Sequence, residues 1–399
     1  MNFPEEFRVM GTFYMINFLE GAAALILPYW IIYFSGIGLS FTQISILMSA
    51  SFVASILFEV PTGVVADVYG RKVSVVLSFF LVGLSLVAVP FAGGFVTLTV
   101  LAFFMQAANT LSTGAWDAWL VDYAKREGGR KLVHPAMARA HAFSLAGTLV
   151  GFLASGFFVA EFGLAMLWII TGILTFAGGI FALVFGKEHF MPRNVKVTKL
   201  LAHTMRESVK GAKYIVNHGV VLYVVLGTAF LAFLSIGEIA WQPFLKDMGM
   251  PLSYFGPLFA AASLAGMAFS VFSRKFAEAA GSRKAALMIS VGAMSVLYFS
   301  ISFVPTYMFA MLIFLLIASV GALHYPLRES YFHKFVPSRN RATVGSIKSL
   351  IYSIVGIIAL FLGGWIADSY GPQAALVACS LLILPAIAIY AMIRDSKKR

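Results

Sequence analysis

The 399-residue sequence has a single cysteine, Cys379, and only 12% of its residues are charged. One cysteine excludes an internal disulfide and makes a cysteine-based metal site implausible. The patterns G-x-x-x-x-G-K-[ST], H-E-x-x-H and G-x-S-x-G are all absent. The usual signs of an ATP-driven protein, a zinc protease or a serine hydrolase are therefore missing, and we expect no catalytic residue, no metal ion and no cofactor.

Apolar side chains are abundant instead, since 60% of the residues are hydrophobic and the mean hydropathy is +0.89. A soluble core of this length does not bury so many. Twelve apolar runs reach the roughly 20 residues that a helix needs to cross about 30 Å of hydrocarbon. Because lipid offers a backbone no hydrogen bonds, such runs must be helical. They are 10–34, 43–64, 73–92, 95–121, 140–160, 162–186, 220–245, 255–272, 286–304, 307–327, 344–367 and 372–393.

The formal net charge of +12 follows from membrane topology. Every Lys and Arg except Lys246 falls on one side of the membrane if the two termini share that side. By the positive-inside rule this side is the cytoplasm. The basic residues are spread over all of its loops, so we expect no nucleic-acid partner. We expect a monomeric multi-pass protein of the plasma (inner) membrane, surrounded by membrane lipid, with both termini cytoplasmic.

The two halves of the chain resemble each other. The offset between matched segments drifts in one direction, as small changes of loop length would cause, so a six-helix unit is duplicated. With six spans each, both copies point the same way, and such parallel repeats build transporters whose substrate binds between two bundles. We predict a six-helix bundle at 1–186, a cytoplasmic linker at 187–219 and a second bundle at 220–399. Matched segments include ADVYGRK at 66–72 with AEAAGSRK at 277–284, and SGFFVAEFG at 155–163 with GGWIADSYG at 363–371.

Besides Glu59 near the end of the second run, three acidic residues lie inside apolar runs, where an ionised carboxylate costs roughly 2.5–3.5 kcal/mol or more. Glu20 lies deep in the first run, Asp117 about one turn inside the fourth, and Glu238 close to the repeat-equivalent position of Glu20. An acid that binds and releases a proton there can carry it across the membrane. We interpret all three as proton-coupling residues, Glu20 first. The alternative is that each is a hydrogen-bonded structural group.

A charged stretch, EVPTGVVADVYGRK at 59–72, separates the second and third runs. Glu59, Gly63 and Asp67 recur every four residues and share one helix face, and Asp67 can pair with Arg71. Gly63 lets another helix come close. The loop pattern Gly63, Asp67, Gly70, Arg71 and Lys72 resembles the signature of the major facilitator superfamily, and a partial copy occurs at Glu278, Gly281, Arg283 and Lys284.

The resemblance implies an all-α membrane protein of twelve transmembrane helices in two parallel six-helix repeats, the major facilitator fold. It implies that Asp67 meets the N-terminus of the eleventh helix near Thr343, and that Arg71 reaches Asp122. These contacts would make Glu59 to Lys72, with Asp122, a gate that latches the outward-open state. The segment STGAWDAWLVD at 112–122 is similar to the fourth span of bacterial drug/proton antiporters. The arginine usual in that span is missing, because Phe104, Met105 and Gln106 fill the region.

The resemblance also assigns the first, fourth, seventh and tenth runs to the wall of a substrate cavity. The aromatic and polar residues there suit an amphipathic or cationic organic substrate. Aromatic residues also gather where membrane meets water, which is the alternative for each of them. The cavity candidates are Asn17, Tyr29, Asn109, Trp116, Trp241, Gln242 and Tyr325.

These features predict a secondary active transporter with a small-molecule substrate and protons as its partners, and not an enzyme. The leading interpretation is proton-coupled export of a small amphipathic organic compound by alternating access. The alternative is proton-coupled uptake of a nutrient or metabolite, and the sequence does not decide between them. A channel fits the duplicated bundles and the intramembrane acids less well.

Overall fold

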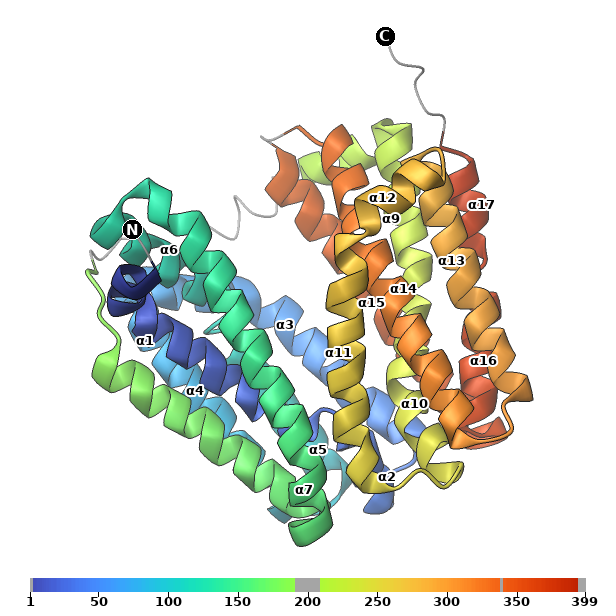
Figure 1. The fold of residues 1–399 in the computed structure, drawn as a ribbon, viewed down its shortest axis with the longest axis horizontal. Coiled ribbons are helices and arrows are strands. Elements are labelled where there is room, and N and C mark those ends of the chain that lie inside the picture. The colour runs from blue at the N-terminus through green and yellow to red at the C-terminus, as the bar shows by residue number, and fades with distance from the viewer. Residues whose placement is uncertain (1–2, 191–208, 338–339, 394–399) are drawn as a thin grey trace. The chain divides into compact units, whose positions relative to one another are not determined.

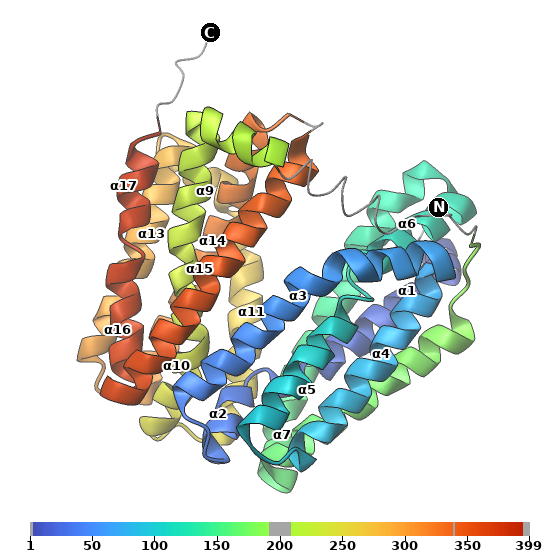
Figure 2. The same ribbon diagram turned by 180° about the vertical axis from the view of Figure 1, so that it is seen from behind.

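The computed structural model describes residues 3–190, 209–337 and 340–393. The described residues form helices and no strand, which confirms the all-α prediction. Figures 1 and 2 show these helices from opposite sides. In the first half they are α1 (Phe3–Ala22), α2 (Trp30–Gly36), α3 (Phe41–Tyr69), α4 (Arg71–Ala88), α5 (Gly94–Asn109), α6 (Ala115–Gly128) and α7 (Arg130–Phe185). In the second half they are α9 (Gly219–Leu231), α10 (Ser235–Asp247), α11 (Phe255–Val271), α12 (Ser273–Ala279), α13 (Arg283–Ser300), α14 (Tyr307–Phe335), α15 (Arg341–Tyr370), α16 (Pro372–Leu382) and α17 (Pro385–Ala391).

Ten helical segments of the described residues are long and apolar enough to cross a membrane. The predicted count of twelve is not confirmed by this criterion, for two reasons. The fourth predicted span, 95–121, is divided between α5 and α6, which are both too short. The fifth and sixth spans both lie in α7, where Gly163 has a non-helical backbone with φ 76° and ψ 174°.

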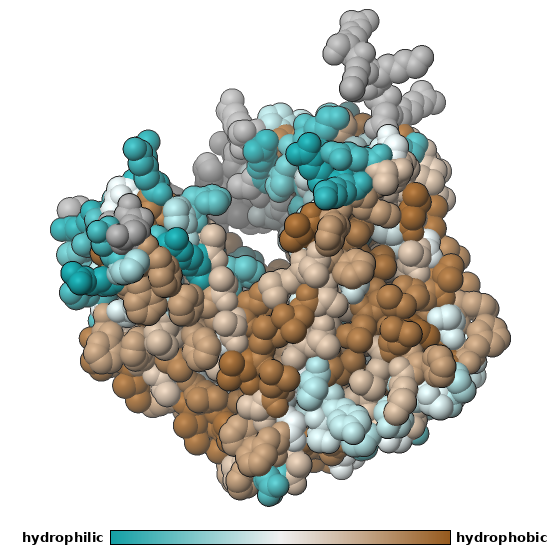
Figure 3. Space-filling view, viewed as in Figure 1, coloured by the Kyte–Doolittle hydropathy of each residue, from teal (hydrophilic) through white to brown (hydrophobic). Residues whose placement is uncertain are grey.

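The helices pack into two compact units. The first unit comprises Met1–Tyr33, Leu47–Leu201 and Leu252–Ala260, and the second comprises Phe34–Ile46, Ala202–Pro251 and Ala261–Arg399. In each unit hydrophilic side chains gather at one end, around α6 in the first and α12 in the second, and hydrophobic side chains cover the helix flanks (Figure 3). The domain boundaries predicted at 186 and 220 stay a prediction, because part of the linker lies outside the described residues.

Glycines bring α1 and α7 of the first unit into close contact. A Cβ atom built on Gly147 of α7 would overlap the carbonyl oxygen of Phe18 on α1. In the same way, a Cβ atom on Gly21 of α1 would overlap the carbonyl oxygen of Ser144 on α7. Small residues are the usual basis of helix packing in lipid, where no hydrophobic effect drives helices together. The absence of a side chain at these glycines therefore sets the distance between α1 and α7.

Left-handed glycines mark matching positions in the two halves of the chain. Only glycine adopts such a backbone without strain, so each marks a place where the chain must turn in one particular way. The duplicated unit inferred from the sequence thus has a counterpart in the backbone conformation. The pairs are Gly38 and Gly249 (φ 93° and 85°), Gly70 and Gly281 (φ 105° and 77°), and Gly163 and Gly371 (φ 76° and 88°).

The packing of α1 on α7 predicts that Gly147→Ala destabilises the protein by about 1–3 kcal/mol, because two backbones must move apart. Thermal unfolding of the purified protein in detergent measures this. Gly178→Ala, in the same helix, is the matched control, since its Cβ atom would lie 4.0 Å from the nearest atom, Leu19 Cβ. Both variants gain the same helix propensity, so equal stability of the two would refute the close packing at Gly147.

Candidate functional site

Each of the three predicted proton-coupling acids lies within one turn of an interruption in its helix. Glu20 lies two residues before the end of α1, where the 3-10 turn Ala23–Ile26 begins. Asp117 is the third residue of α6 and follows a non-helical turn. Glu238 is the fourth residue of α10 and follows the 3-10 turn Ala232–Leu234. All three side chains are exposed. The helix dipole favours an acid in the first turn of a helix, where Asp117 and Glu238 lie.

Side-chain hydroxyls from two other helices hold the turn between α5 and α6. The Ser74 hydroxyl of α4 is buried and donates to the carbonyl oxygen of Leu111 at 2.7 Å. The Thr62 hydroxyl of α3 lies 3.1 Å from the carbonyl oxygen of Thr110 and also bonds within its own helix. Such bonds offset the cost of carbonyl groups that leave a helix in apolar surroundings. The continuous span predicted at 95–121 is therefore wrong at this point, and Asp117 lies in the first turn of a new helix.

Glu20 lies in the last turn of α1 and Asp117 in the first turn of α6, two helices that pack against each other. Asn17, one turn before Glu20, is buried, and its amide donates to the carbonyl oxygen of Phe13 at 2.8 Å. Trp116 precedes Asp117, and its ring centroid lies 5.8 Å from that of Phe13. The first unit thus brings two of the predicted acids together with two of the predicted cavity residues.

The other predicted cavity residues are placed differently. Tyr29 is fully buried, and its hydroxyl accepts a hydrogen bond of 3.0 Å from the backbone N–H of Gly256. Trp241 and Gln242 are also buried, within the second unit. These three side chains are packed among the helices, and their assignment to a substrate cavity stays a prediction. Asn109 is half-buried and ends α5.

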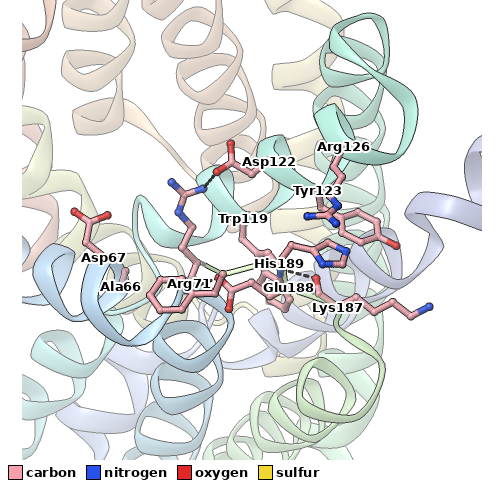
Figure 4. A pocket seen from close by; sticks show the side chains of 11 residues that line it. Ala66, Asp67, Arg71, Trp119, Asp122, Tyr123, Arg126, Lys187, Glu188 and His189 are labelled. Carbon is pink, nitrogen blue, oxygen red and sulfur yellow. Dashed lines mark hydrogen bonds and ion pairs between the residues drawn. The ribbon is translucent and has the colours of Figure 1, made fainter. Parts of the chain in front are cut away.

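The 59–72 stretch forms the end of α3 and the start of α4, which meet at Gly70. Arg71 donates to the carboxylate of Asp122 on α6 and, at 2.7 Å, to the carbonyl oxygen of Ala118 (Figure 4). The ion pair expected between Arg71 and Asp122 is thus present in the structure. Among the described residues Arg71 does not pair with Asp67, because the turn at Gly70 puts the two on different helices.

Glu59 and Gly63 are exposed on α3, and Asp67 and Lys72 are half-buried. A Cβ atom on Gly63 would have no atom of the described residues within 4 Å. The close helix approach expected at this glycine is therefore not seen in this structure. The expected contact of Asp67 with the helix that begins near Thr343 stays a prediction.

Glu188 is a member of this site that sequence patterns did not reveal. Its carboxylate accepts the backbone N–H groups of Arg71 at 2.7 Å and Lys72 at 3.1 Å, the first two residues of α4. A Cβ atom on Gly70 would lie 2.8 Å from the Glu188 carboxylate. A side chain at Gly70 would push this carboxylate aside, and the positive φ of 105° at Gly70 separately favours glycine. An anion in this position satisfies free N–H groups and the helix dipole together.

The second half of the chain caps the equivalent helix by other means. There Gly281 is followed by Ser282, whose hydroxyl accepts the N–H of Ala285 at 3.0 Å and caps α13. The first half has no residue between Gly70 and Arg71, and α4 has no side-chain cap from its own N-cap residue. Glu188, more than a hundred residues away in the chain, supplies the missing cap.

The segment after α7 also closes a cavity in the first unit. The Trp119 indole of α6 donates to the carbonyl oxygen of Lys187 at 2.9 Å and fixes this segment. Figure 4 shows Glu188 between α4 and α6, beside Arg71. The cavity has a volume of about 240 Å³, and charged and aromatic side chains of α3, α4, α6 and the segment Lys187–Phe190 line it.

The second unit contains a charged cluster that sequence patterns did not separate from the other basic loop residues. Lys348 of α15 donates to both carboxylate oxygens of Glu329 on α14, at 2.7 and 2.6 Å. Arg328 donates Nε and Nη2 to the same carboxylate, at 3.2 and 3.1 Å. All three side chains are largely buried: Arg328 is 13% exposed, Glu329 is 21% exposed and Lys348 is 10% exposed. Together with the predicted residue Tyr325, they line a cavity of about 570 Å³.

Sequence comparison relates the whole chain to known transporters. The family model of the Major Facilitator Superfamily matches residues 11–294 and 239–399. The MFS-type transporter YxaM of Bacillus subtilis is 26% identical over 401 residues, which cover 97% of this chain and 96% of YxaM. The multi-drug resistance efflux pump PmrA of Streptococcus pneumoniae is 22% identical, over 92% of this chain and 91% of PmrA.

Solved structures show the same fold. The nucleoside transporter NupG superimposes with a TM-score of 0.78 at 14% identity, over 97% of this chain and all of that one (100%). A D-xylose-proton symporter superimposes with a TM-score of 0.70 at 13% identity, over 97% of both chains. At these identities the likeness is one of fold alone. Because the family model matches the chain from residue 11 to its end, and the described residues form long apolar helices, the protein belongs to the major facilitator superfamily of multi-pass membrane transporters.

Proposed function

We propose that the protein exports a small amphipathic organic compound in exchange for protons, by alternating access. The observation that carries this proposal is the placement of Glu20, Asp117 and Glu238 at helix interruptions inside apolar spans. The relation to PmrA, a multi-drug resistance efflux pump, supports export. In this proposal both termini are cytoplasmic, as the distribution of Lys and Arg requires.

The proposed coupling rests on the difference in cost between a charged and a neutral acid. Enclosing an ionised carboxylate in apolar surroundings is expensive, whereas a protonated carboxyl group is much cheaper to enclose. The turn before α6 provides polar backbone groups beside Asp117, where water and substrate can approach the acid. A transporter whose unloaded form closes over Glu20 and Asp117 only when they are protonated moves protons in every cycle.

We also infer that Arg71, Asp122 and Glu188 form a latch at the start of α4, here called the α4 latch. Glu188 fixes the helix end, and Arg71 then reaches Asp122 on α6. The Asp122 side chain is 59% exposed, so the ion pair is worth no more than about 1 kcal/mol. A contact of this strength can form and break within a transport cycle.

Proton-coupled uptake of a nutrient or metabolite is the second candidate. The family resemblance predicts an arginine in this region of an exporter. Here Gln106 occupies the region, and its amide donates to the Ser55 hydroxyl at 2.7 Å. The same three acids would serve coupling in either direction. The direction of substrate movement relative to the proton gradient distinguishes the two candidates.

Replacing Glu20 by glutamine is expected to reduce gradient-driven substrate movement about tenfold or more, because an amide side chain does not take up and release protons as a carboxylate does. A tenfold loss corresponds to a free-energy difference of about 1.4 kcal/mol. The assay uses proteoliposomes with an imposed pH gradient and a compound selected with the wild type from a panel of amphipathic cations, anions and neutral molecules. Exchange of labelled for unlabelled compound without a gradient is expected to persist in Glu20→Gln.

Glu161→Gln is the matched control for this experiment. Glu161 is an exposed carboxylate on α7, two residues before Gly163, and its replacement is expected to leave coupled movement at the wild-type rate. If Glu20→Gln also keeps the wild-type response to the gradient, Glu20 is not the coupling acid.

The α4 latch predicts that Glu188→Gln destabilises the protein by about 1 kcal/mol, since glutamine offers no charge and only one suitable acceptor to two N–H groups. Hydrogen exchange of a peptide that begins several residues before Arg71 and includes Lys72, together with thermal unfolding, measures this. The control is Glu278→Gln in the second half, where an exposed pair with Arg274 at 2.9 Å is worth about 0.3–0.5 kcal/mol. Unchanged exchange at Arg71 and Lys72 in Glu188→Gln would contradict the latch.

A further inference from the structure

We propose that the cavity in the second unit binds an amphipathic organic anion, with Arg328 holding its acidic group. This inference rests on the proposed transport function and names its substrate class. The cavity, of about 570 Å³, has a volume typical of small-molecule sites, roughly 300–1,000 Å³.

The charges within the cavity do not balance. Arg328 and Lys348 each carry one positive charge, and Glu329 is the carboxylate that both of them contact. Among the described residues no second carboxylate pairs with either cation. The His333 Nε2 lies 3.9 Å from the Glu329 carboxylate. A largely buried cation without its own counter-ion is costly, and a ligand anion removes that cost.

The geometry of Arg328 leaves part of its guanidinium group available to a ligand. Nε and Nη2 both donate to the same oxygen of Glu329. Within the described part of the chain, Nη1 has no acceptor. The guanidinium carbon lies 5.2 Å from the centroid of the Tyr325 ring, which supports the group from one side. A planar guanidinium fork is well suited to a carboxylate, to which it can donate two parallel hydrogen bonds.

His324 is a second, independent sign of a ligand in this cavity. Its side chain lines the cavity one turn before Arg328 and is only 4% exposed. The Ser290 hydroxyl lies 2.7 Å from Nδ1 and 2.9 Å from the carbonyl oxygen of Leu287. Nδ1 is thus engaged by Ser290, and Nε2 is the ring nitrogen left for a further hydrogen bond. Nε2 is buried and has no hydrogen-bond partner in the described residues.

These groups specify the ligand. Residues one turn apart on a helix lie about 6 Å from each other, so an acidic group at Arg328 and a hydrogen-bonding group at His324 can belong to one small molecule. The remaining wall accommodates an apolar or aromatic body. It includes Leu231, Leu234, Met294, Phe332 and Tyr352. The substrate class is therefore an aromatic or otherwise apolar acid with a second polar group such as a hydroxyl, which can both donate and accept a hydrogen bond.

Titration calorimetry of the purified full-length protein in detergent tests this with two probes, hydroxynaphthoate and its neutral carboxamide. The wild type is expected to bind the carboxylate at least about tenfold more tightly than the amide, as one charge-assisted hydrogen-bonded pair allows. In Arg328→Gln this preference is expected to disappear. Equal affinity of the wild type for both probes would overturn the proposal.

Two further variants distinguish the effect of the cavity's net charge from the structural effect of the Glu329–Lys348 ion pair. Glu329→Gln adds one net positive charge and is expected to bind hydroxynaphthoate more tightly than the wild type. The double variant Glu329→Gln with Lys348→Met restores the wild-type net charge without the ion pair, and it is expected to keep the preference for the carboxylate. It also covers the case in which Glu329→Gln alone fails to fold. If the double variant folds and loses the preference as Arg328→Gln does, the cluster is structural and the proposal is wrong.

These titrations use no pH gradient. A negative result therefore removes the anion site and leaves the Glu20 experiment unaffected. Conversely, wild-type coupling in Glu20→Gln would refute the proposed coupling without changing the binding preference measured here.

Discussion

The structure depends on one constraint, that a polypeptide backbone in apolar surroundings must find hydrogen-bond partners within the protein. An uninterrupted helix meets this demand by itself, whereas an interrupted helix needs outside partners. The Ser74 hydroxyl supplies such a partner to Leu111 where α5 ends, and Thr62 approaches Thr110. A turn so supported can sit inside a span of the membrane and place Asp117 at a helix N-terminus.

Hydropathy and charge were sufficient to predict the all-α membrane fold, because both depend on the lipid and not on which helices are neighbours. The same information could not show the interruption before α6, since 110–114 contains no proline and its hydroxyl partners come from α3 and α4. The ion pair of Arg71 with Asp122 was expected from family resemblance, whereas the expected pairing of Arg71 with Asp67 fails because Gly70 separates their helices.

The residues missed from the sequence have a common physical cause. In the sequence, Glu188 and Glu329 do not differ from the charged residues around them. Only the fold places Glu188 against Arg71 and Glu329 against Lys348. The positive-inside rule explains the side of the membrane on which a basic residue lies, but it says nothing of whether that residue is buried or paired. The duplicated halves differ at this level too, since Ser282 caps its own helix and α4 takes its cap from Glu188.

The central claim is that the turn before α6, held by Ser74, positions Asp117 for proton coupling. Gradient-driven movement of a substrate by Ser74→Ala in proteoliposomes tests it most directly. Ser85→Ala is the control, because within the described residues the Ser85 hydroxyl bonds only to the carbonyl oxygen of Leu81 in its own helix, at 2.8 Å. The account predicts that Ser74→Ala loses most of its response to the pH gradient although Glu20 and Asp117 are intact, while Ser85→Ala responds like the wild type. Equal and undiminished responses of both variants would contradict it.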